Sequence, residues 1–305
     1  MADHAIPHHP STAGRPGASA AAEREADAWH RLRNAHGFIF DMDGVLYRGD
    51  QPLAGVSDVF DALAVRGRRF MLATNNSMST PAQYVAKLAR MGIDVPEDVI
   101  LTSGIATRDY LLQTLPPSSG IFVIGMPGLR EQLFTDTAFY PVQYGEERAQ
   151  AVVVGLDLTF DYAKLKAANE AIRQGAIFVA TNVDATLPTE AGLVPGAGSI
   201  VASVSTASGR QPVVIGKPET PLVDQAMRHM NFTPDETVMI GDRLDTDILA
   251  GQRAGMLSVL LLTGVSTRED VASSPTPPDL VLTDLPALVD ALAAAAPMAT
   301  DGSLS

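Results

Sequence analysis

The chain of 305 residues contains no cysteine. This absence excludes disulfides, cysteine nucleophiles and thiolate metal sites, and it fits a reducing compartment. Long apolar runs are missing as well, since none approaches the ~20 residues that a membrane-spanning helix needs. The first residues show no basic segment followed by an apolar one, so we expect no secretory signal. Together these absences predict a cytoplasmic protein with no membrane partner.

Positive charge is scarce. There are 22 Lys and Arg residues against 35 Asp and Glu residues, which gives a formal net charge of -13. Such a surface repels a phosphate backbone, so we expect no nucleic-acid partner. A small anionic ligand would need a local cluster of positive charge or a bound cation. Apolar material is ample, because 46% of the residues are hydrophobic and only 19% are charged, as in globular proteins.

Short apolar runs alternate with amphipathic stretches. The runs are rich in Val, Ile, Leu and Phe without polar alternation, which is typical of strands buried on both faces. The expected strands are 37–40, 69–74, 120–125, 151–155, 176–181, 212–216, 237–241, 258–262 and 279–282. Strand and helix alternation predicts an α/β fold with a mainly parallel sheet covered by helices.

Helical periodicity fills the intervals between the expected strands. In residues 56–67 four apolar side chains share one face, and Gly67 suits the C-terminal cap. Residues 220–230 predict another helix, with Thr220 as N-cap and Pro221 at its first position. Residues 1–34 and 293–305 are rich in small and polar residues, so we expect a disordered N-terminal tail and a flexible C-terminal tail.

Polar residues follow four of the expected strands, at the point where ligands bind to open parallel sheets. The four segments are Asp41-Met42-Asp43-Gly44, Thr74-Asn75-Asn76-Ser77, Lys217-Pro218 and the acidic stretch from Asp242 to Asp247. If these strands are neighbours, one rim of the sheet collects carboxylates, hydroxyl and amide donors, and a lysine.

This set of residues suits phosphoryl chemistry. Gathered carboxylates repel one another unless a cation neutralises them, and all-oxygen ligands suit Mg²⁺. One carboxylate can then attack phosphorus while a second, two residues beyond, handles protons. Lysine, threonine and asparagine can hold the phosphoryl oxygens. Each segment taken alone has an ordinary interpretation as a turn, a solvated loop or the start of a helix, so the inference depends on the combination.

The sequence resembles the haloacid dehalogenase superfamily of phosphohydrolases. The segments that carry the resemblance are "FDMDGVLYRGD", "ATNNS", "GKP", "GDRLDTDILAG", "TNVDATLPTEAGLVPGAGSIV" and "LLLTGVSTRED". They span nearly everything from about residue 36 to residue 290. The residues of these motifs are most similar to those of subclass IIA. This subclass includes NagD-type nucleotide phosphatases and 4-nitrophenyl, phosphoglycolate and pyridoxal phosphate phosphatases.

The resemblance implies a role for each matching residue. Asp41 would be the nucleophile that forms an aspartyl-phosphate, and Asp43 would be the general acid and base. Mg²⁺ would be held by Asp41, by the backbone carbonyl of Asp43 and by Asp242. Lys217 would pair with Asp41 and with the phosphoryl group. The remaining phosphate-binding residues would be Thr74, Asn75 and Asn76.

Two further acids lie in the segment "GDRLDTDILAG", which also contains Asp242. The resemblance points to Asp247 as the carboxylate behind the direct metal ligands, with Asp245 facing solvent. An aspartate at position 43 also argues against dehalogenation, because the dehalogenases of this superfamily lack it.

The resemblance implies a Rossmann-like core with an α/β cap of type C2a inserted between the second and third motifs. We expect the core at 35–114 and 211–292 and the cap at 115–210, and three of the expected strands fall inside the cap. The cap loop "TNVDATLP" would supply substrate choice through Asn182, Asp184 and Leu187, although Asp184 also suits a local turn. Leu187 stands where the pyridoxal phosphatases have histidine, which argues against that substrate.

Three other classes of protein share some of these features. Receiver domains gather similar residues but lack a second acid two positions after the nucleophile. A non-catalytic or phospho-accepting regulatory protein on the same fold is the main alternative, although no motif residue is replaced. A sugar-phosphate mutase would need a small cap between the first two motifs, and the interval from Val45 to Arg69 is too short. We therefore expect a Mg²⁺-dependent hydrolase of a small phosphorylated metabolite, with a possible homodimer through the cap.

Overall fold

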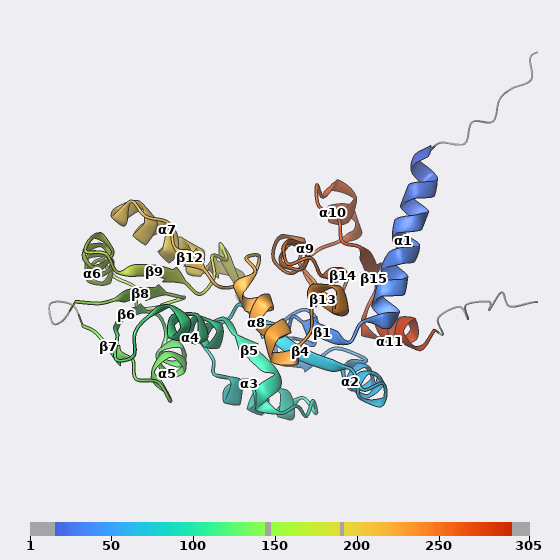
Figure 1. Cartoon of the computed structure of the whole chain (residues 1–305), viewed down its shortest axis with the longest axis horizontal. Coiled ribbons are helices and arrows are strands. Elements are labelled where there is room, and N and C mark those ends of the chain that lie inside the picture. Colours follow the sequence, from blue (N-terminus) through green and yellow to red (C-terminus); the bar gives the residue numbers. More distant parts are fainter. Residues whose placement is uncertain (1–15, 144–147, 190–191, 295–305) are drawn as a thin grey trace, which may run out of the picture.

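The computed structural model describes residues 16–143, 148–189 and 192–294. Two parallel sheets form the centres of two lobes, the core and the cap (Figure 1). The lobes are joined by the segments before β6 (Gly120–Ile124) and after β12 (Val213–Val214). The α/β class with mainly parallel sheets is thus confirmed. No helix in the described part of the chain is long and apolar enough to cross a membrane.

The core sheet has the strand order β15-β14-β13-β1-β4-β5, and every neighbouring pair is parallel. Its strands are β1 (Gly37–Phe40), β4 (Arg69–Thr74), β5 (Ile100–Thr102), β13 (Thr237–Gly241), β14 (Leu257–Leu261) and β15 (Leu280–Leu282). The chain builds outward from β1 to β5 on one side and returns at β13 on the other. The order in which the strands are added therefore reverses between β1 and β13. Ligands bind to open parallel sheets at this point, outside the carboxyl ends of the strands.

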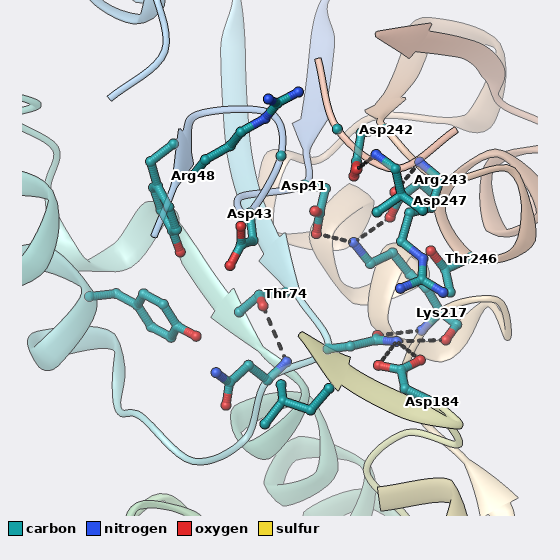
Figure 2. Close-up of a pocket in the computed structure, with 18 of the residues that line it drawn as sticks. Asp41, Asp43, Arg48, Thr74, Asp184, Lys217, Asp242, Arg243, Thr246 and Asp247 are labelled. Atoms are coloured by element: carbon teal, nitrogen blue, oxygen red, sulfur yellow. Dashed lines mark hydrogen bonds and ion pairs between the residues drawn. The ribbon is translucent and has the colours of Figure 1, made fainter. Parts of the chain in front are cut away.

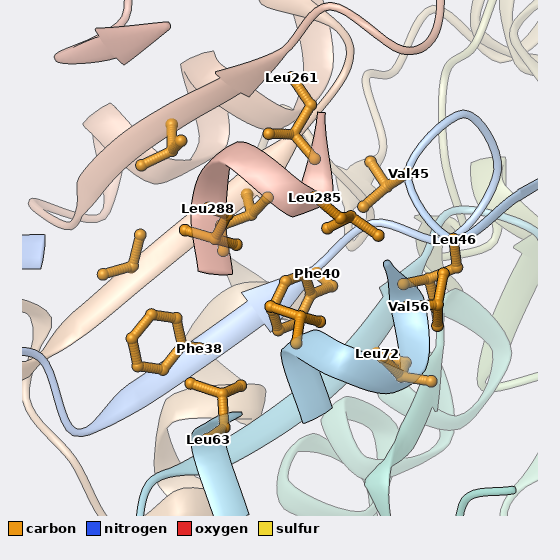
Figure 3. Close-up of a cluster of buried hydrophobic side chains, with 14 of the residues drawn as sticks. Phe38, Phe40, Val45, Leu46, Val56, Leu63, Leu72, Leu261, Leu285 and Leu288 are labelled. Carbon is orange, nitrogen blue, oxygen red and sulfur yellow. The ribbon is translucent and has the colours of Figure 1, made fainter. Parts of the chain in front are cut away.

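Strand β1 is buried on both faces, as its uninterrupted apolar sequence predicts. Phe38 and Phe40 face a cluster that also holds Leu63 from helix α2 (Val56–Val65) and Leu288 from helix α11 (Leu285–Ala293) (Figure 3). Ile39 points the opposite way, into a second cluster that extends to the cap sheet. The central strand is thereby fixed on both sides, and so is the residue that follows it.

The cap sheet has the strand order β12-β9-β8-β6-β7, again all parallel. Its strands are β6 (Gly120–Ile124), β7 (Tyr140–Pro141), β8 (Ala151–Val154), β9 (Ile177–Ala180) and β12 (Val213–Val214). Two antiparallel hairpins complete the strands, namely β2 (Tyr47–Arg48) with β3 (Gln51–Pro52) and β10 (Thr186–Thr189) with β11 (Gly192–Pro195).

The position of β12 corrects one expectation. Residues 212–216 were expected as a strand of the rim that carries the other polar segments, but Val213 and Val214 pair with β9 in the cap sheet. A two-residue apolar strand gives no sign of which sheet it joins, because both sheets offer a parallel edge. Lys217 therefore reaches the core from the returning end of the cap. The boundaries near 115 and 210 stay predictions.

Helices cover both sheets. They are α1 (Pro16–Asn34), α2 (Val56–Val65), α3 (Pro81–Arg90), α4 (Ser103–Thr114), α5 (Pro127–Phe134), α6 (Tyr162–Arg173), α7 (Ala197–Ser208), α8 (Pro221–Met230), α9 (Leu249–Arg253), α10 (Arg268–Ser273) and α11 (Leu285–Ala293), with the short turns η1 (Glu97–Val99), η2 (Pro234–Glu236) and η3 (Leu244–Ile248). Thr220 occupies the N-cap position of α8 as expected, but its side chain makes no capping hydrogen bond.

Helix α1 corrects the expected disorder of residues 1–34. It runs from Pro16 to Asn34 along the outer edge of the core beside β15 (Figure 1). Ala28 and Leu32 are one turn apart and fully packed into the core cluster, and Trp29 packs against its edge. Three apolar residues in an alanine-rich stretch were too weak a pattern to predict this packing. Residues 1–15 and most of the expected C-terminal tail lie outside the described residues.

Candidate active site

The carboxyl ends of β1, β4 and β13 open into a cavity of about 400 Å³ between the core and the cap (Figure 2). Asp41 follows β1 directly, Thr74 is the last residue of β4, and Asp242 follows β13. The three strands are adjacent and parallel, so these side chains meet at one edge. Lys217 and Asp184 reach the same cavity from the segments that belong to the cap.

Three carboxylates form a compact cluster. One oxygen from each of Asp41, Asp242 and Asp247 lies within 4.8 Å of the others. In Asp242, Oδ2 accepts a hydrogen bond from the Val265 N–H at 2.7 Å, whereas Oδ1 is buried and has no hydrogen-bond partner among the described residues. An unpartnered carboxylate oxygen beside two other carboxylates suits a hard cation such as Mg²⁺, which prefers oxygen ligands.

Two glycines close around Asp242. A Cβ on Gly44 would come within 2.5 Å of Asp242 Oδ2, and a Cβ on Gly264 would collide with the same atom. Gly44 also has φ +85, a left-handed conformation in which other residues are strained. Gly44 therefore allows a sharp turn directly after Asp43, and the backbone at both glycines fixes the carboxylate in place.

Lys217 lies between two members of the cluster. Its ammonium is 2.6 Å from Asp41 Oδ1 and 2.7 Å from Asp247 Oδ1, and it donates to the Ala73 carbonyl at 2.9 Å. These three acceptors use all three of its N–H donors. Burial alone would lower the pKa of Lys217, but Asp247 and Asp41 outweigh burial and raise that pKa above its usual value. Lys217 is therefore a fixed positive charge.

Two acids of the cluster, Asp41 and Asp242, resist ionisation when only protein surrounds them. Burial, with repulsion from Asp247 and Asp242, raises the pKa of Asp41 to about 8 although Lys217 lowers it. Burial and repulsion from Asp247 likewise raise the pKa of Asp242 to about 7. A bound divalent cation would remove this repulsion and favour the ionised carboxylates, so the electrostatics fit a metal site.

Asp43 opens to the cavity beside this cluster. Partial burial raises the pKa of Asp43 above its usual value, while the nearby Lys87 and the N–H of Gly44 lower it. A carboxyl whose pKa is raised can hold a proton nearer neutral pH, which a general acid requires. The hairpin after β1 places Tyr47 next to it through an isolated bridge between Asp43 and Tyr47.

The turn η3 decides which acid faces inward. It is a single π-helical turn from Leu244 to Ile248, a geometry that is frequent at functional sites. Asp247 is buried and accepts from the Arg243 N–H at 3.1 Å, in addition to its contact with Lys217. Asp245 is 69% exposed and forms a two-point ion pair with the Arg243 side chain.

Asn75 holds the lysine rather than presenting a free amide. Its Oδ1 accepts from the Lys217 N–H at 2.8 Å, and its Nδ2 donates to the Lys217 carbonyl at 2.8 Å and to Asp184 at 3.1 Å. Asn76 is freer, since its Oδ1 accepts only from the Met78 N–H and its own N–H donates to Thr74 Oγ1 at 3.1 Å. Of the two asparagines expected to bind phosphate, Asn75 thus uses its side-chain amide to bind Lys217 and Asp184.

The cap loop contributes two of its three expected residues to the main cavity. Asp184 and Leu187 line it, whereas Asn182 lines a smaller adjoining cavity of about 70 Å³. The Asn182 amide donates to the Asn75 carbonyl at 2.8 Å, and its oxygen accepts from the Asp184 N–H. Its role is therefore to dock the loop on the core. Burial raises the pKa of Asp184, although Asn75 and Arg243 lower it.

Several residues of the cavity wall were not expected as site residues from the sequence, and five of them carry a charged or aromatic side chain. They are Tyr47, Arg48, Tyr84, Lys87 and Arg243. Arg48 and Arg243 lie inside quoted motif segments, and their positive charge so close to the acids was an available signal. Tyr84 and Lys87 belong to helix α3, where nothing local distinguishes them from an ordinary amphipathic pattern.

The chain matches known proteins over both lobes. A family model described as "Haloacid dehalogenase-like hydrolase" matches residues 38–135, and one described as "HAD-hydrolase-like" matches residues 214–288. An acid sugar phosphatase of Staphylococcus aureus is 37% identical over 254 residues, which cover 83% of this chain and 96% of that protein.

Solved structures agree. A 4-nitrophenylphosphatase from Thermotoga maritima is 37% identical, covers 86% of this chain and 99% of its own, and has a TM-score of 0.81. A glycerol phosphate phosphatase from Mycobacterium tuberculosis, solved in complex with magnesium, is 33% identical, covers 85% of this chain and 77% of its own, and has a TM-score of 0.77.

Proposed function

The chain belongs to the haloacid dehalogenase-like hydrolases, as a phosphatase of subclass IIA, and we propose that it hydrolyses small phosphomonoesters with Mg²⁺ through an aspartyl-phosphate on Asp41. The observation that carries this proposal is the cluster of Asp41, Asp242 and Asp247 with its unpartnered Asp242 oxygen, held against the buried Lys217. A phosphorylated small molecule is the substrate class that the phosphatase relatives imply.

Asp41, Asp242 and the main-chain carbonyl of Asp43 would hold the metal, with Asp247 orienting Lys217 behind them. The metal, when bound, would neutralise the acidic cluster and attract the phosphoryl oxygens. With the metal bound, Lys217 would further favour the ionised form of Asp41 and direct it, because its ammonium is only 2.6 Å from that carboxylate.

Two steps follow from the positions of the acids. A carboxylate oxygen of Asp41 attacks phosphorus as the bond to the leaving oxygen breaks, and Asp43 gives its proton to that oxygen. Asp43 then accepts a proton from the water that attacks the acyl phosphate, which releases inorganic phosphate and restores Asp41. Thr74, Asn76 and the backbone N–H groups of this loop would hold the phosphoryl oxygens, while Asn75 acts by positioning Lys217.

Release of inorganic phosphate from a panel of phosphomonoesters, with Mg²⁺ or with a chelator, tests this proposal. We expect turnover that needs Mg²⁺ and falls by a factor of about 10³ or more in Asp41→Asn, because the nucleophile is lost. Asp61→Asn is the matched control, since Asp61 is an exposed acid on α2. Unaltered turnover in Asp41→Asn would contradict the mechanism. Stable phosphorylation of Asp41 without release would favour a phospho-accepting regulatory protein.

A homodimer through the cap is part of the same proposal. Leu158, Tyr162 and Leu193 are 68%, 79% and 71% exposed on the cap, and a dimer through the cap would cover such apolar side chains. Sedimentation analysis should give a dimer mass for the native chain and a monomer for a variant with Tyr162→Glu and Leu193→Glu. A monomeric native chain would contradict the dimer. Location in the cytoplasm stays a prediction from the sequence.

A further inference from the structure

Lys87 is a cation in the wall of the catalytic cavity with no acceptor of its own. It extends from α3, and within the described segments neither an ion pair nor a hydrogen bond joins its ammonium to a carboxylate or carbonyl. The other cations of the wall are engaged: Lys217 by two carboxylates, Arg243 by Asp245, and Arg48 by the Thr263 carbonyl. Only Lys87 among them has its full hydrogen-bonding capacity available.

An aromatic ring keeps this ammonium in place. Lys87 Nζ lies 4.0 Å from the centroid of the Tyr47 ring, a cation–π contact, and Tyr47 is only 2% exposed. Tyr47 is in turn tied to the first motif, through its bridge with Asp43 and through its carbonyl, which accepts from the Gly44 N–H at 2.8 Å. The ammonium is therefore held at a fixed place relative to Asp43 rather than moving freely in solvent.

That place is the leaving-group side of the cavity. A general acid has to lie within hydrogen-bond reach of the oxygen that it protonates, so the first atoms of the leaving alcohol lie beside Asp43. Lys87 is within electrostatic reach of Asp43, whereas the phosphoryl-binding side holds Lys217 and the carboxylate cluster. A cation at this position meets the alcohol part of the substrate and not the phosphoryl group that is transferred.

We propose that Lys87 is a specificity-determining residue that binds a second anionic group, a carboxylate or a second phosphate, on the leaving alcohol. The enzyme would then prefer phosphate esters of anionic alcohols to those of neutral ones. A negative charge on the leaving alcohol needs a dedicated positive partner in this protein. The formal net charge of the chain is -13, which would otherwise repel an anionic alcohol. This inference rests on the proposed phosphatase activity.

The test compares esters that share one two-carbon skeleton and differ in charge. They are 2-phosphoglycolate with a carboxylate, ethylene glycol bisphosphate with a second phosphate, 2-hydroxyethyl phosphate with a neutral hydroxyl, and phosphoethanolamine with an ammonium. For the native enzyme we expect kcat/KM for at least one anionic ester to exceed that for the neutral ester by about tenfold to a hundredfold, the range of a charge-assisted hydrogen bond. Whichever anionic ester is favoured identifies the second group.

Three variants assign the preference to Lys87. In Lys87→Met the ratio of kcat/KM for the anionic ester to that for the neutral ester should fall to within about threefold of unity, and Lys87→Arg should keep the native ratio. Any effect of Lys87 on Asp43 acts on all four esters alike and cancels in this ratio. Lys166→Met is the matched control for net charge, because Lys166 lies on the cap helix α6 and its side chain is 53% exposed. The control should leave every ratio unchanged.

Two results would overturn the inference. In Lys87→Met, an equal loss for all four esters would place the effect of the ammonium on the chemistry that the esters share, at the transferred phosphoryl group or at Asp43, whereas native kcat/KM for every ester would leave Lys87 only a packing role against Tyr47. Both differ from failure of the proposed function, in which the native enzyme releases no phosphate from any ester. Circular dichroism of each variant separates misfolding from a change of specificity, and Lys87→Gln repeats the test should Lys87→Met fail to fold.

Discussion

The side-chain amide of Asn75 pairs with both backbone polar groups of Lys217, with two hydrogen bonds of 2.8 Å. The same amide reaches Asp184 of the cap loop at 3.1 Å, and the Asn75 carbonyl accepts from Asn182 and from Ser103. One residue at the end of β4 therefore joins the core, the cap loop and the returning segment that carries the lysine. The position of the lysine relative to Asp41 depends on this junction.

Replacing Asn75 by alanine should lower kcat by about tenfold to a hundredfold. The backbone N–H and carbonyl of Lys217 would lose their partners, and leaving such groups unpaired costs about 1–3 kcal/mol, enough to shift the lysine. Steady-state kinetics on the best ester would measure the effect, with Asn34→Ala on α1 as the control. Native kcat in Asn75→Ala would show that Lys217 is held by its ion pairs alone.

Without metal, the stability of the fold should decrease as pH rises from about 5 to about 8.5. The folded-state pKa values of Asp41 and Asp242 are about 8 and about 7, above the usual value of 3.8. In that window the folded protein retains protons on these two carboxyls, whereas the unfolded chain has released them. The free energy of unfolding therefore falls, for each carboxyl, by up to about 1.4 kcal/mol per pH unit. Melting temperatures measured in chelator should show the slope.

Mg²⁺ should reverse this trend, since it binds the ionised form of the cluster. The increase in melting temperature on adding Mg²⁺ should be larger at the upper end of the window than at the lower end. Asp242→Asn should flatten the slope in chelator and abolish most of the response to Mg²⁺. A metal-free stability that is constant between these pH values would contradict the assigned electrostatics.

Truncating Leu32 to alanine should lower the free energy of unfolding by about 2–5 kcal/mol, because the side chain is fully buried beneath α1. Urea unfolding followed by the fluorescence of Trp29, the single tryptophan, would report on the same helix. Arg24→Ala is the control, as Arg24 is exposed on that helix. A loss below about 0.5 kcal/mol, the range of surface substitutions, would mean that α1 adds little to the core.

Local signals in the sequence were sufficient for the centre of the fold and for the acids. The uninterrupted apolar run before Asp41 predicts a buried strand, and β1 spans Gly37–Phe40 as expected. The acids that follow β1 and β13 meet because those strands are neighbours, which the strand order confirms. The spacing of residues within a motif depends only on their positions along the chain, so a single sequence is sufficient to reveal it.

Features that depend on distant packing could not be predicted. The two-residue strand β12 joins the cap sheet, and α1 is ordered by contacts with residues more than two hundred positions away. The π-helical turn that directs Asp247 inward has no characteristic amino-acid composition by which the sequence could predict it. Lys87 is one of two basic residues on an amphipathic helix, and only the position of Tyr47 in the fold distinguishes it.

The central claim is that Asp41 becomes phosphorylated during turnover, and mass spectrometry of the Asp43→Asn variant tests it most directly. This variant lacks the group that activates water but can still be phosphorylated by 4-nitrophenyl phosphate, whose leaving group needs little protonation. With Mg²⁺ present, we expect the intact protein to gain the mass of one phosphoryl group, mapped to Asp41 after digestion and absent when Asp41→Asn is added. Release of phosphate with no labelled protein, or a label on another residue, would contradict the account.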